Sequence, residues 1–534
     1  MESKLIDDNL TEYFPEDIDY DETTLLNRKE PEQKSLSPPL NLDEFIDEIE
    51  FGLFHFIIVV ASGLCYSTVS LLTQAAGLVI IAACDLDTDN HNQIWWVLSN
   101  IIGTLIGSAI LGRLKDAIGR RKILLLSTCL NLIVTILSAF AYNYILVLIF
   151  AIFNGIGFGG IFTSVHAYCL EFFPRKYRGK AIGCLTACII FGSVYSSGMG
   201  YIILPHRFHA PLGKIYFSSW RLYLLVCTLP IIISFLLLLW APDSLRFRIK
   251  RGEMEKVIRI INKIYRTNSY CHRDGHLYRL VTPPDLNKSQ GKDNHDDKNI
   301  QLANEYSFKC HFSQIIQRQT LLKIIALSVT WFGYCFCFYG LWTMLPLLIS
   351  FYLNGNTCSG HYHNFTTLFN NQENPGHSVC LNSQNRATLL IYVLFGNLLS
   401  IPVALICVLS INFIGRKWLF SFLAFLSSII ILLIWLIDTA LSTLILACFF
   451  AGVLINGWIP LKLLSSESFP TEFRSTTLGI FTIFGGIGSL CGIFSFSSLF
   501  KTNCSTSFIL LIVNCLVSGL IPIIFRDTTD LAIN

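Results

Sequence analysis

The chain has 534 residues, of which 53% are hydrophobic and only 14% are charged. A soluble domain of this length needs more polar side chains to cover its surface, so the composition favours a polytopic membrane protein. The net charge of +3 is too small for this length to indicate a nucleic-acid-binding protein. Most of the 18 cysteines lie in apolar runs, where a thiol behaves as a small apolar group, so they do not indicate a disulfide framework.

Residues 1–50 are predicted to form a disordered cytosolic tail, because they are acidic, rich in proline and lack an apolar run. Within this tail, DETTLL places Asp21 four positions before the pair Leu25 and Leu26. The segment resembles the acidic dileucine signals by which adaptor complexes sort membrane cargo. This resemblance implies a clathrin adaptor as a partner, and the alternative is a chance leucine pair in a solvated tail.

Twelve apolar runs follow the tail, and each is close to the roughly 20 residues that a helix needs to cross a bilayer. They predict an all-α membrane protein with a six-helix bundle over 51–242 and a second over 320–525. The approximate spans are 52–82, 94–112, 123–142, 144–169, 180–205, 221–241, 320–349, 387–411, 418–437, 442–466, 475–498 and 506–525.

The predicted turn between the second and third spans reads GRLKDAIGRRK. Arg120 and Arg121, with three other basic residues, place it on the cytoplasmic side by the positive-inside rule. Gly112 and Gly119 let helix ends approach or turn sharply, because they lack a Cβ atom. Asp116 can accept charge-assisted hydrogen bonds from a neighbouring helix end or a guanidinium group.

Other short turns also carry basic residues at the predicted cytoplasmic side, so both termini are expected in the cytosol. Residues 243–319 are predicted to be a central cytoplasmic loop, and residues 526–534 a short cytosolic tail. The segment RGEMEKVIRIINKIY in the central loop has apolar residues at helical spacing, which predicts an amphipathic helix.

The connection 351–386 is predicted to lie outside the membrane, in the lumen or the extracellular space. It contains the sequon Asn364-Phe365-Thr366, so Asn364 is a predicted glycosylation site. In an oxidising compartment Cys358 and Cys380 form a disulfide or remain two free thiols. The histidines of this loop are expected to be solvated, and the sequence predicts neither a metal site nor another cofactor.

Two acidic residues end helices and are followed, seven residues later and beyond a proline, by a base: Glu171 with Arg178, and Glu467 with Arg474. Such pairs can link helix ends in one conformation and release them in another, as a gate does. The alternative is a static surface ion pair worth about 0–1 kcal/mol. Four glycines in each of the fourth and eleventh spans allow close packing, with or without sliding.

Lys462 is the outstanding charged residue inside a span, one turn from Trp458 and five residues before Glu467. An unpaired ammonium group there is costly, by about 2.5–3.5 kcal/mol, so it is expected to face a hydrated substrate cavity or a carboxylate. The alternatives are that Lys462 snorkels to the cytoplasmic face or pairs structurally with Glu467.

The turn motif G-x-L-x-D-x-x-G-R-R resembles the signature of the major facilitator superfamily. The segments YCLEFFPRKYRG, APDSLRFRIKRG and SSESFPTEFRSTTLG resemble motifs of its sugar-porter-like branch. Over about residues 50–525, FNGIGFGGI, YIILPH, SWRLYLLVC and FYGLWTMLP resemble the synaptic vesicle glycoprotein 2 group. The resemblance implies a 6+6 fold with pseudo-two-fold related halves, and a transporter rather than an enzyme.

The same resemblance implies a ligand cavity walled by Tyr201, Phe338, Tyr339 and Trp458, and Trp342 could line the same space. Where the family has acids in the first helix, this chain has Ser67 and Ser70, and Lys462 replaces an aspartate. The usual proton-carrying acids are therefore missing from these positions. A facilitator, a protein that binds an anionic solute against Lys462, or a protein that no longer transports would each fit.

The first functional hypothesis is a facilitator or secondary transporter of a small organic solute that works by alternating access. The second is a transport-incompetent membrane protein with a binding or trafficking role. Either is expected to be a monomer in the plasma membrane or in intracellular vesicles.

Overall fold

Twelve helical spans are long and apolar enough to cross a membrane in the described part of the chain. A computed structural model describes residues 46, 51–83, 93–206, 209–212, 215–269, 318–342, 345, 348, 383–437, 440–469 and 474–524. All of them belong to one unit, Ile46–Asn534. The predicted all-α fold with twelve transmembrane helices is confirmed.

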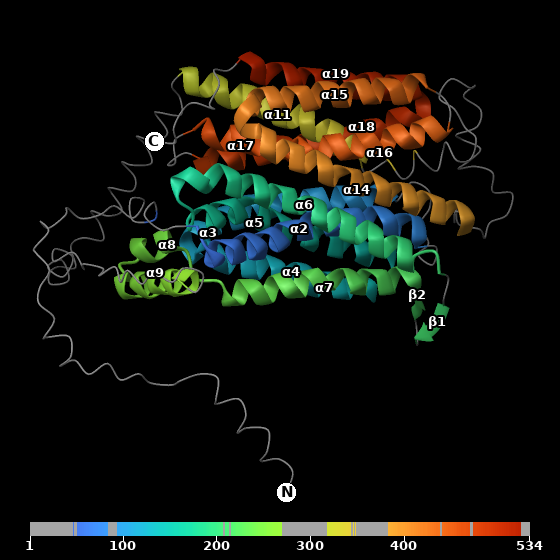
Figure 1. Cartoon of the computed structure of the whole chain (residues 1–534). Coiled ribbons are helices and arrows are strands. Elements are labelled where there is room, and N and C mark those ends of the chain that lie inside the picture. The colour runs from blue at the N-terminus through green and yellow to red at the C-terminus, as the bar shows by residue number, and fades with distance from the viewer. Residues whose placement is uncertain are drawn as a thin grey trace, which may run out of the picture. The chain divides into compact units, whose positions relative to one another are not determined.

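The helices fall into two sets of six spans, with two short helices between them (Figure 1). The first set is α2 (Leu53–Ala82), α3 (Gln93–Ile118), α4 (Arg120–Ala139), α5 (Tyr144–Leu170), α6 (Arg175–Ile203) and α7 (Ser219–Trp240). The short helices are α8 (Leu245–Lys250) and α9 (Met254–Ser269). The second set is α11 (Arg318–Trp342), α14 (Ser383–Ile414), α15 (Arg416–Leu436), α16 (Ala440–Asn456), α17 (Trp458–Glu467), α18 (Arg474–Thr502) and α19 (Cys504–Leu520), which continues into the 3-10 helix η3 (Ile521–Ile524).

The two halves repeat one packing scheme. In the first half α2 packs on α6, α3 on α5 and α4 on α7, and in the second half α11 packs on α18, α14 on α16 and α15 on α19. Counted along each half, the first helix thus meets the fifth, the second meets the fourth, and the third meets the sixth. The halves meet where α3 packs on α18 and α6 packs on α14 and α17.

Glycines bring the backbones of α3 and α5 into direct contact. A Cβ atom on Gly107 would lie 2.6 Å from the Cα atom of Ile156, and one on Gly155 would lie 2.8 Å from the backbone nitrogen of Thr104. Both distances are too short for a real Cβ atom. The second half repeats the arrangement, because a Cβ atom on Gly492 of α18 would lie 2.9 Å from the carbonyl carbon of Phe336 on α11. These glycines therefore set the helix spacing.

The turn after the second span is much shorter than predicted. Helix α3 continues to Ile118 and α4 begins at Arg120, so most of the predicted hydrophilic turn is helical. Gly119 reverses the chain with φ = 108°, in the region that favours glycine. Gly112 lies within α3 against α5, where a Cβ atom would lie 3.4 Å from Cγ2 of Thr163.

The tenth span is divided at Gly457, where the sequence predicts one continuous helix. Pro460 has no backbone N–H to bond to the carbonyl four residues earlier, so the helical ladder is interrupted at this point. The helical hydrogen bonds resume at the next residue, since Leu461 N bonds to Gly457 O at 3.2 Å. The break separates α16 from α17, which carries Trp458 and Lys462.

A β-hairpin that the sequence analysis did not predict connects α6 to α7. Its strands are β1 (His209–Leu212) and β2 (Ile215–Ser218), which pair in antiparallel register with His209 opposite Ser218. In Figure 1 the hairpin lies at one end of the bundle, called here the hairpin end. Helices α8 and α9 lie at the opposite end, called here the α9 end.

Helix α9 lies where the sequence predicts an amphipathic helix, with Val257, Ile261 and Ile264 buried. Its last turn caps the beginning of α2. Asn268 Oδ1 accepts a hydrogen bond of 3.0 Å from Phe54 N, one of the N–H groups that lack a partner within α2. One side chain therefore supplies a helix cap and fastens α9 to the bundle.

We expect Asn268→Ala to lower the free energy of unfolding by about 1 kcal/mol, because the first turn of α2 loses a side-chain cap. Thermal denaturation of the purified protein, with limited proteolysis of α9, measures the effect. Asn262→Ala is the matched control, since Asn262 is exposed on the same helix. Equal melting temperatures for the two variants would contradict the capping role.

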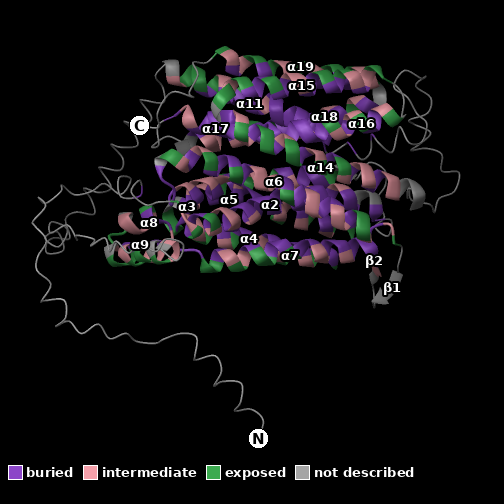
Figure 2. Ribbon diagram, viewed as in Figure 1, coloured by how far each residue is buried: buried purple, intermediate pink, exposed green. Residues whose placement is uncertain are grey.

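Apolar side chains cover the outward faces of the helices. Leu405, Ile406, Leu409 and Phe413 of α14 are more than half exposed, and Phe413 reaches 90%. Figure 2 shows exposed residues on outward faces and buried residues where helices meet. Since the exposed side chains of a water-soluble bundle are polar, these faces are lipid-facing. The chain is a multi-pass membrane protein.

Candidate functional site

A cavity of ≈ 200 Å³ lies between the two halves. Helices α2, α3, α5 and α6 of the first half and α11, α17 and α18 of the second half contribute to its wall. Its lining extends to the α9 end, where it includes Glu171, Arg178 and Arg246. Three residues predicted to line a substrate cavity belong to the wall: Tyr339, Trp458 and Lys462.

Lys462 of α17 belongs to this wall, and only 7% of the residue is exposed. Its Nζ atom lies 4.2 Å from the ring centroid of Tyr66, 4.9 Å from that of Phe162 and 5.8 Å from that of Trp458. Tyr66 and Phe162 come from α2 and α5, so a cation of the second half contacts aromatic rings of the first.

No hydrogen-bond acceptor or carboxylate partners Lys462 among the described residues. The predicted alternative, in which Lys462 pairs with Glu467, does not occur, because the Glu467 carboxylate lies against Arg416. The ring faces compensate only part of the cost of removing an ammonium group from water. Lys462 is thus a buried basic side chain at a cavity wall.

The other predicted aromatic residues lie outside the described wall of this cavity. Phe338 lies behind the wall, with ring centroids 5.0 Å from Tyr339 and 5.6 Å from Trp458. Trp342 lines a separate, smaller pocket. Tyr201 is 40% exposed near the C-terminal end of α6. The aromatic cluster is continuous, but only part of it faces the cavity.

Ser67 and Ser70 also differ from the prediction, because both hydroxyl groups bond to backbone carbonyls, that of Ser70 to α6 and that of Ser67 to its own helix. Ser70 Oγ donates to the carbonyl of Ile189 at 2.5 Å, and Ser67 Oγ donates to the carbonyl of Leu64 at 2.8 Å. A Cβ atom on Gly192 of α6 would lie 2.1 Å from the carbonyl oxygen of Ser67 and 2.4 Å from Ser70 Oγ, both too close for a real Cβ atom. These hydroxyl groups are therefore engaged in helix packing and are not part of the described cavity wall.

Three residues around Lys462 were not predicted from the sequence: Tyr66, Phe162 and His166. His166 lines the cavity, and its ring centroid lies 4.9 Å from that of Tyr66. Phe162 and His166 are four residues apart, so they share one face of α5. This spacing was visible in the sequence, but an aromatic face on a span usually indicates packing, and nothing in the sequence linked it to Lys462.

Two equivalent ion pairs occur at the α9 end, one in each half. Arg120 pairs with Glu171, and Arg416 pairs with Glu467, with Nε and Oε2 2.9 Å apart. Both pairs join residues 51 positions apart, and each arginine begins a helix. The pairs connect α4 to the end of α5 and α15 to the end of α17.

Arg120 and Arg416 are thus partners of Glu171 and Glu467 that the seven-residue spacing in the sequence did not predict. Arg178 is buried, and its Nε atom donates to the carbonyl of Phe173 at 3.1 Å. The backbone of Arg474 begins α18, and the side chains of Arg474 and Asp116 lie outside the described part of the structure.

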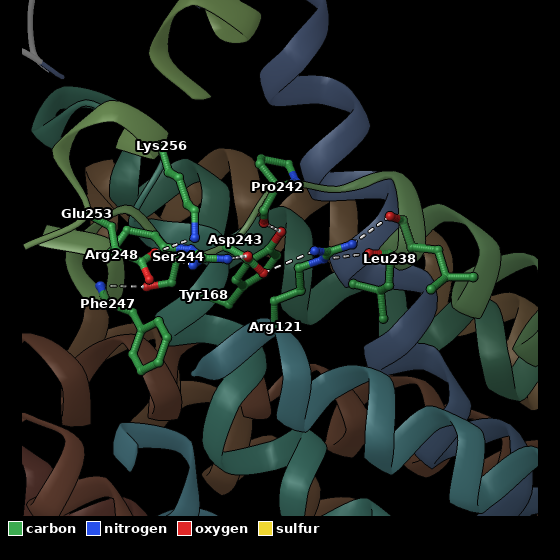
Figure 3. A network of polar contacts seen from close by, with 11 residues as sticks. Arg121, Tyr168, Leu238, Pro242, Asp243, Ser244, Phe247, Arg248, Glu253 and Lys256 are labelled. Atoms are coloured by element: carbon green, nitrogen blue, oxygen red, sulfur yellow. Dashed lines mark hydrogen bonds and ion pairs between the residues drawn. The ribbon is translucent and has the colours of Figure 1, made fainter. Parts of the chain in front are cut away.

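Arg121 fastens the end of α7 and the segment after it to α4 (Figure 3). Its Nε atom donates to Leu238 O at 3.1 Å, and its Nη1 atom lies 3.0 Å from Asp243 Oδ1. Asp243 also pairs with Arg248, which pairs with Glu253. The network thus continues from α4 through α8 to the beginning of α9.

The electrostatics of this network favour an ionised Asp243. Burial by itself raises the pKa of Asp243, but hydrogen bonds from Arg248 and Arg121 outweigh it and leave the pKa below the usual value of 3.8. Because the folded-state pKa is lowered, the resulting stability is present above about pH 4 and is lost as the pH falls through that lowered value.

Residues 56–369 match the profile of the Major Facilitator Superfamily, over more than half of the chain. The chain belongs to the major facilitator superfamily. It is 26% identical over 325 residues to synaptic vesicle glycoprotein 2B of Homo sapiens, covering 58% of this chain and 47% of the relative. It is 25% identical over 378 residues to synaptic vesicle glycoprotein 2C of Mus musculus, covering 67% of this chain and 52% of the relative. The chain spans about half the length of these relatives.

Solved structures of this superfamily show the same fold. The partially occluded inward open xylose transporter XylE of E. coli has a TM-score of 0.60 and 15% identity, covering 89% of this chain and 98% of that one. A D-xylose-proton symporter has a TM-score of 0.58 and 16% identity, covering 90% and 99%. At these identities the likeness shows the fold alone.

Several predicted sites lie outside the described residues of this superfamily member. They are the sorting residues Asp21, Leu25 and Leu26, the sequon residue Asn364, and the cysteines Cys358 and Cys380. Cys504, at the beginning of α19, is disulfide-bonded, which the sequence analysis did not predict.

Proposed function

We propose that the protein is a facilitator or secondary transporter that moves a small organic solute by alternating access. The observation that carries the proposal is the cavity between the halves, whose wall includes the buried, cationic Lys462. In transporters built from two related halves, the substrate site lies near the bilayer centre at their interface. Membership of the major facilitator superfamily supports this role.

We infer that the α9 end faces the cytosol, because the basic residues of the Arg120 and Arg416 regions gather there. The lining of the cavity by Arg178 and Arg246 supports a path toward that side. Similarity to synaptic vesicle glycoproteins supports a location in intracellular vesicles.

Facilitation without proton coupling is favoured by the charges of the cavity. Glu171 is the single acidic residue of its described lining, and this residue pairs with Arg120 at the α9 end. A proton-coupling carboxylate must bind and release its proton during the transport cycle, which a paired, buried carboxylate resists. Solute movement should therefore follow the solute gradient.

One observation favours the second candidate, a transport-incompetent binding protein. The contacts of Lys462 with Tyr66 and Phe162 join the two halves across the cavity. If those contacts persist in every conformation of the protein, the halves cannot rock apart. The cavity then binds a solute but does not carry it across the membrane.

Uptake into proteoliposomes tests transport, and the expected result is solute entry above that of protein-free vesicles for part of a panel of sugars, carboxylates and amines. We expect Thr482→Trp to slow this entry by an order of magnitude or more, because Thr482 lines the cavity and an indole fills much of it. Ile483→Trp is the control, since Ile483 is exposed on the outward face of the same helix. Absence of uptake for the whole panel by folded protein would favour the binding role.

A further inference from the structure

We infer that the cavity binds a small organic anion with an apolar body, whose negative group lies beside Lys462. This inference rests on the proposed role of the cavity as a solute site and specifies the class of solute.

The charges of the cavity wall are predominantly positive. The cationic residues of its described lining are Lys115, Arg120, Arg178, Arg246 and Lys462. The same described lining contains one carboxylate, that of Glu171. A cleft with one sign of charge and low-dielectric walls concentrates ions of the other sign, so it attracts anions.

Lys462 differs from the other four cations in its surroundings. Lys115 and Arg120 at the α9 end donate hydrogen bonds to backbone carbonyls of α5. Lys462 Nζ instead lies 4.2, 4.9 and 5.8 Å from three aromatic ring centroids, and no acceptor is within hydrogen-bond distance in the described structure. A carboxylate at the cavity wall would give this ammonium group its charge-assisted hydrogen bonds.

The groups beside Lys462 also leave hydrogen-bonding capacity unused. Tyr66 Oη and His166 Nε2 are buried without a hydrogen-bond partner among the residues that the structure describes. Since unpartnered buried polar atoms are uncommon in folded proteins, their position next to one buried cation indicates a polar binding region. The second half contributes the cation and the first half contributes both polar atoms.

The remaining wall suits an apolar body better than a sugar. Threonine hydroxyls of the lining donate to carbonyls of their own helices: Thr73 to Val69 O at 2.7 Å, Thr104 to Asn100 O at 2.9 Å and Thr482 to Leu478 O at 2.8 Å.

The indole N–H of Trp331, another lining residue, donates to Ser465 Oγ at 2.8 Å. A solute rich in hydroxyl groups would therefore find these threonine hydroxyls and this indole N–H already donating, and its unpaired polar groups on this part of the wall would oppose binding. Apolar residues such as Val97, Leu105 and Phe158 provide the complementary surface for a hydrocarbon body.

Binding and uptake of matched probes by the full chain test the inference. Benzoate and phenyl phosphate carry a negative group on a ring, benzamide is the neutral counterpart of benzoate, and D-xylose is a sugar. We expect millimolar benzoate or phenyl phosphate to raise the melting temperature of the purified protein, and benzamide and D-xylose to have little effect.

Lys462→Met keeps the length of the side chain and removes its charge, so it is expected to weaken anion binding by roughly ten- to hundred-fold. Lys462→Arg is expected to retain binding within a few-fold. Lys263→Met is the matched control, because Lys263 of α9 lies 4.0 Å over the ring of Trp240 and outside the described cavity wall. The control is expected to bind as the unmodified protein does.

The results separate the anion site from the proposed transport. Anion binding that depends on Lys462, without uptake, would support the anion site and contradict transport. Uptake of D-xylose that Lys462→Met leaves unchanged, with no binding of either anion, would support transport and overturn the anion site. Anion binding that is equal in Lys462→Met and Lys263→Met would also overturn it.

Discussion

Replacing Gly107 by alanine is expected to prevent normal assembly of the first half. The added methyl group would lie 2.6 Å from the Cα atom and 2.8 Å from the carbonyl carbon of Ile156. These are backbone atoms of α5, so relief requires moving a whole helix rather than one side chain. We expect a cost at or above the roughly 1–3 kcal/mol of ordinary overpacking. The yield of monodisperse protein in size-exclusion chromatography and its melting temperature measure the effect.

Gly77→Ala is the matched control for Gly107→Ala. Gly77 also lies within a transmembrane helix, α2, but apart from the neighbouring backbone of that helix no described atom lies within 4 Å of the position of an added Cβ atom. Alanine is favoured over glycine in helices by about 1 kcal/mol, so this variant is expected to be unchanged or slightly stabilised. Equal behaviour of the two variants would refute the close approach of α3 and α5.

Replacing Arg416 is also expected to cause a large loss of stability. Arg416→Met leaves the Glu467 carboxylate, whose side chain is 7% exposed, without its guanidinium partner. Breaking a buried ion pair from one side costs about 3–5 kcal/mol, and we expect a value near the lower end because the side chain of Glu467 has further contacts. Thermal denaturation of Arg416→Met, Glu467→Gln and the double variant gives the coupling between the two residues.

The exposed pair Arg259 and Glu255 on α9 provides the control cycle. Their side chains are 77% and 89% exposed, with Nη2 and Oε2 3.7 Å apart, so a coupling of at most about 0.5 kcal/mol is expected. A coupling between Arg416 and Glu467 no larger than this would show that the buried pair is energetically equivalent to a surface pair.

The same cycle bears on the gate hypothesis. If the pair opens during transport, Glu467→Gln should change the rate of solute entry more than it changes the melting temperature. A purely structural pair would lower both together. The equivalent pair Arg120 and Glu171 in the first half offers an independent repeat of this comparison.

The sequence alone determined the number of spans, their order and the unusual position of Lys462. These properties depend on local composition, because a run of about 20 apolar residues is sufficient to define a span and a charge within it is conspicuous. The motif around Gly119 likewise identified the superfamily. Its helical geometry was not predicted, because a one-residue reversal depends on a single backbone angle.

The tertiary structure alone decided which residues meet. Arg120 binds Glu171 across 51 residues, Ser70 binds the backbone of α6, and Lys462 contacts Tyr66 in the other half. Such partners are distant in sequence, and they meet because the packing of the helices brings them together, as the close approach of α2 and α6 at Gly192 does for Ser70. Hydropathy measures how apolar a span is as a whole, but it does not determine which face turns toward lipid, toward another helix or toward the cavity.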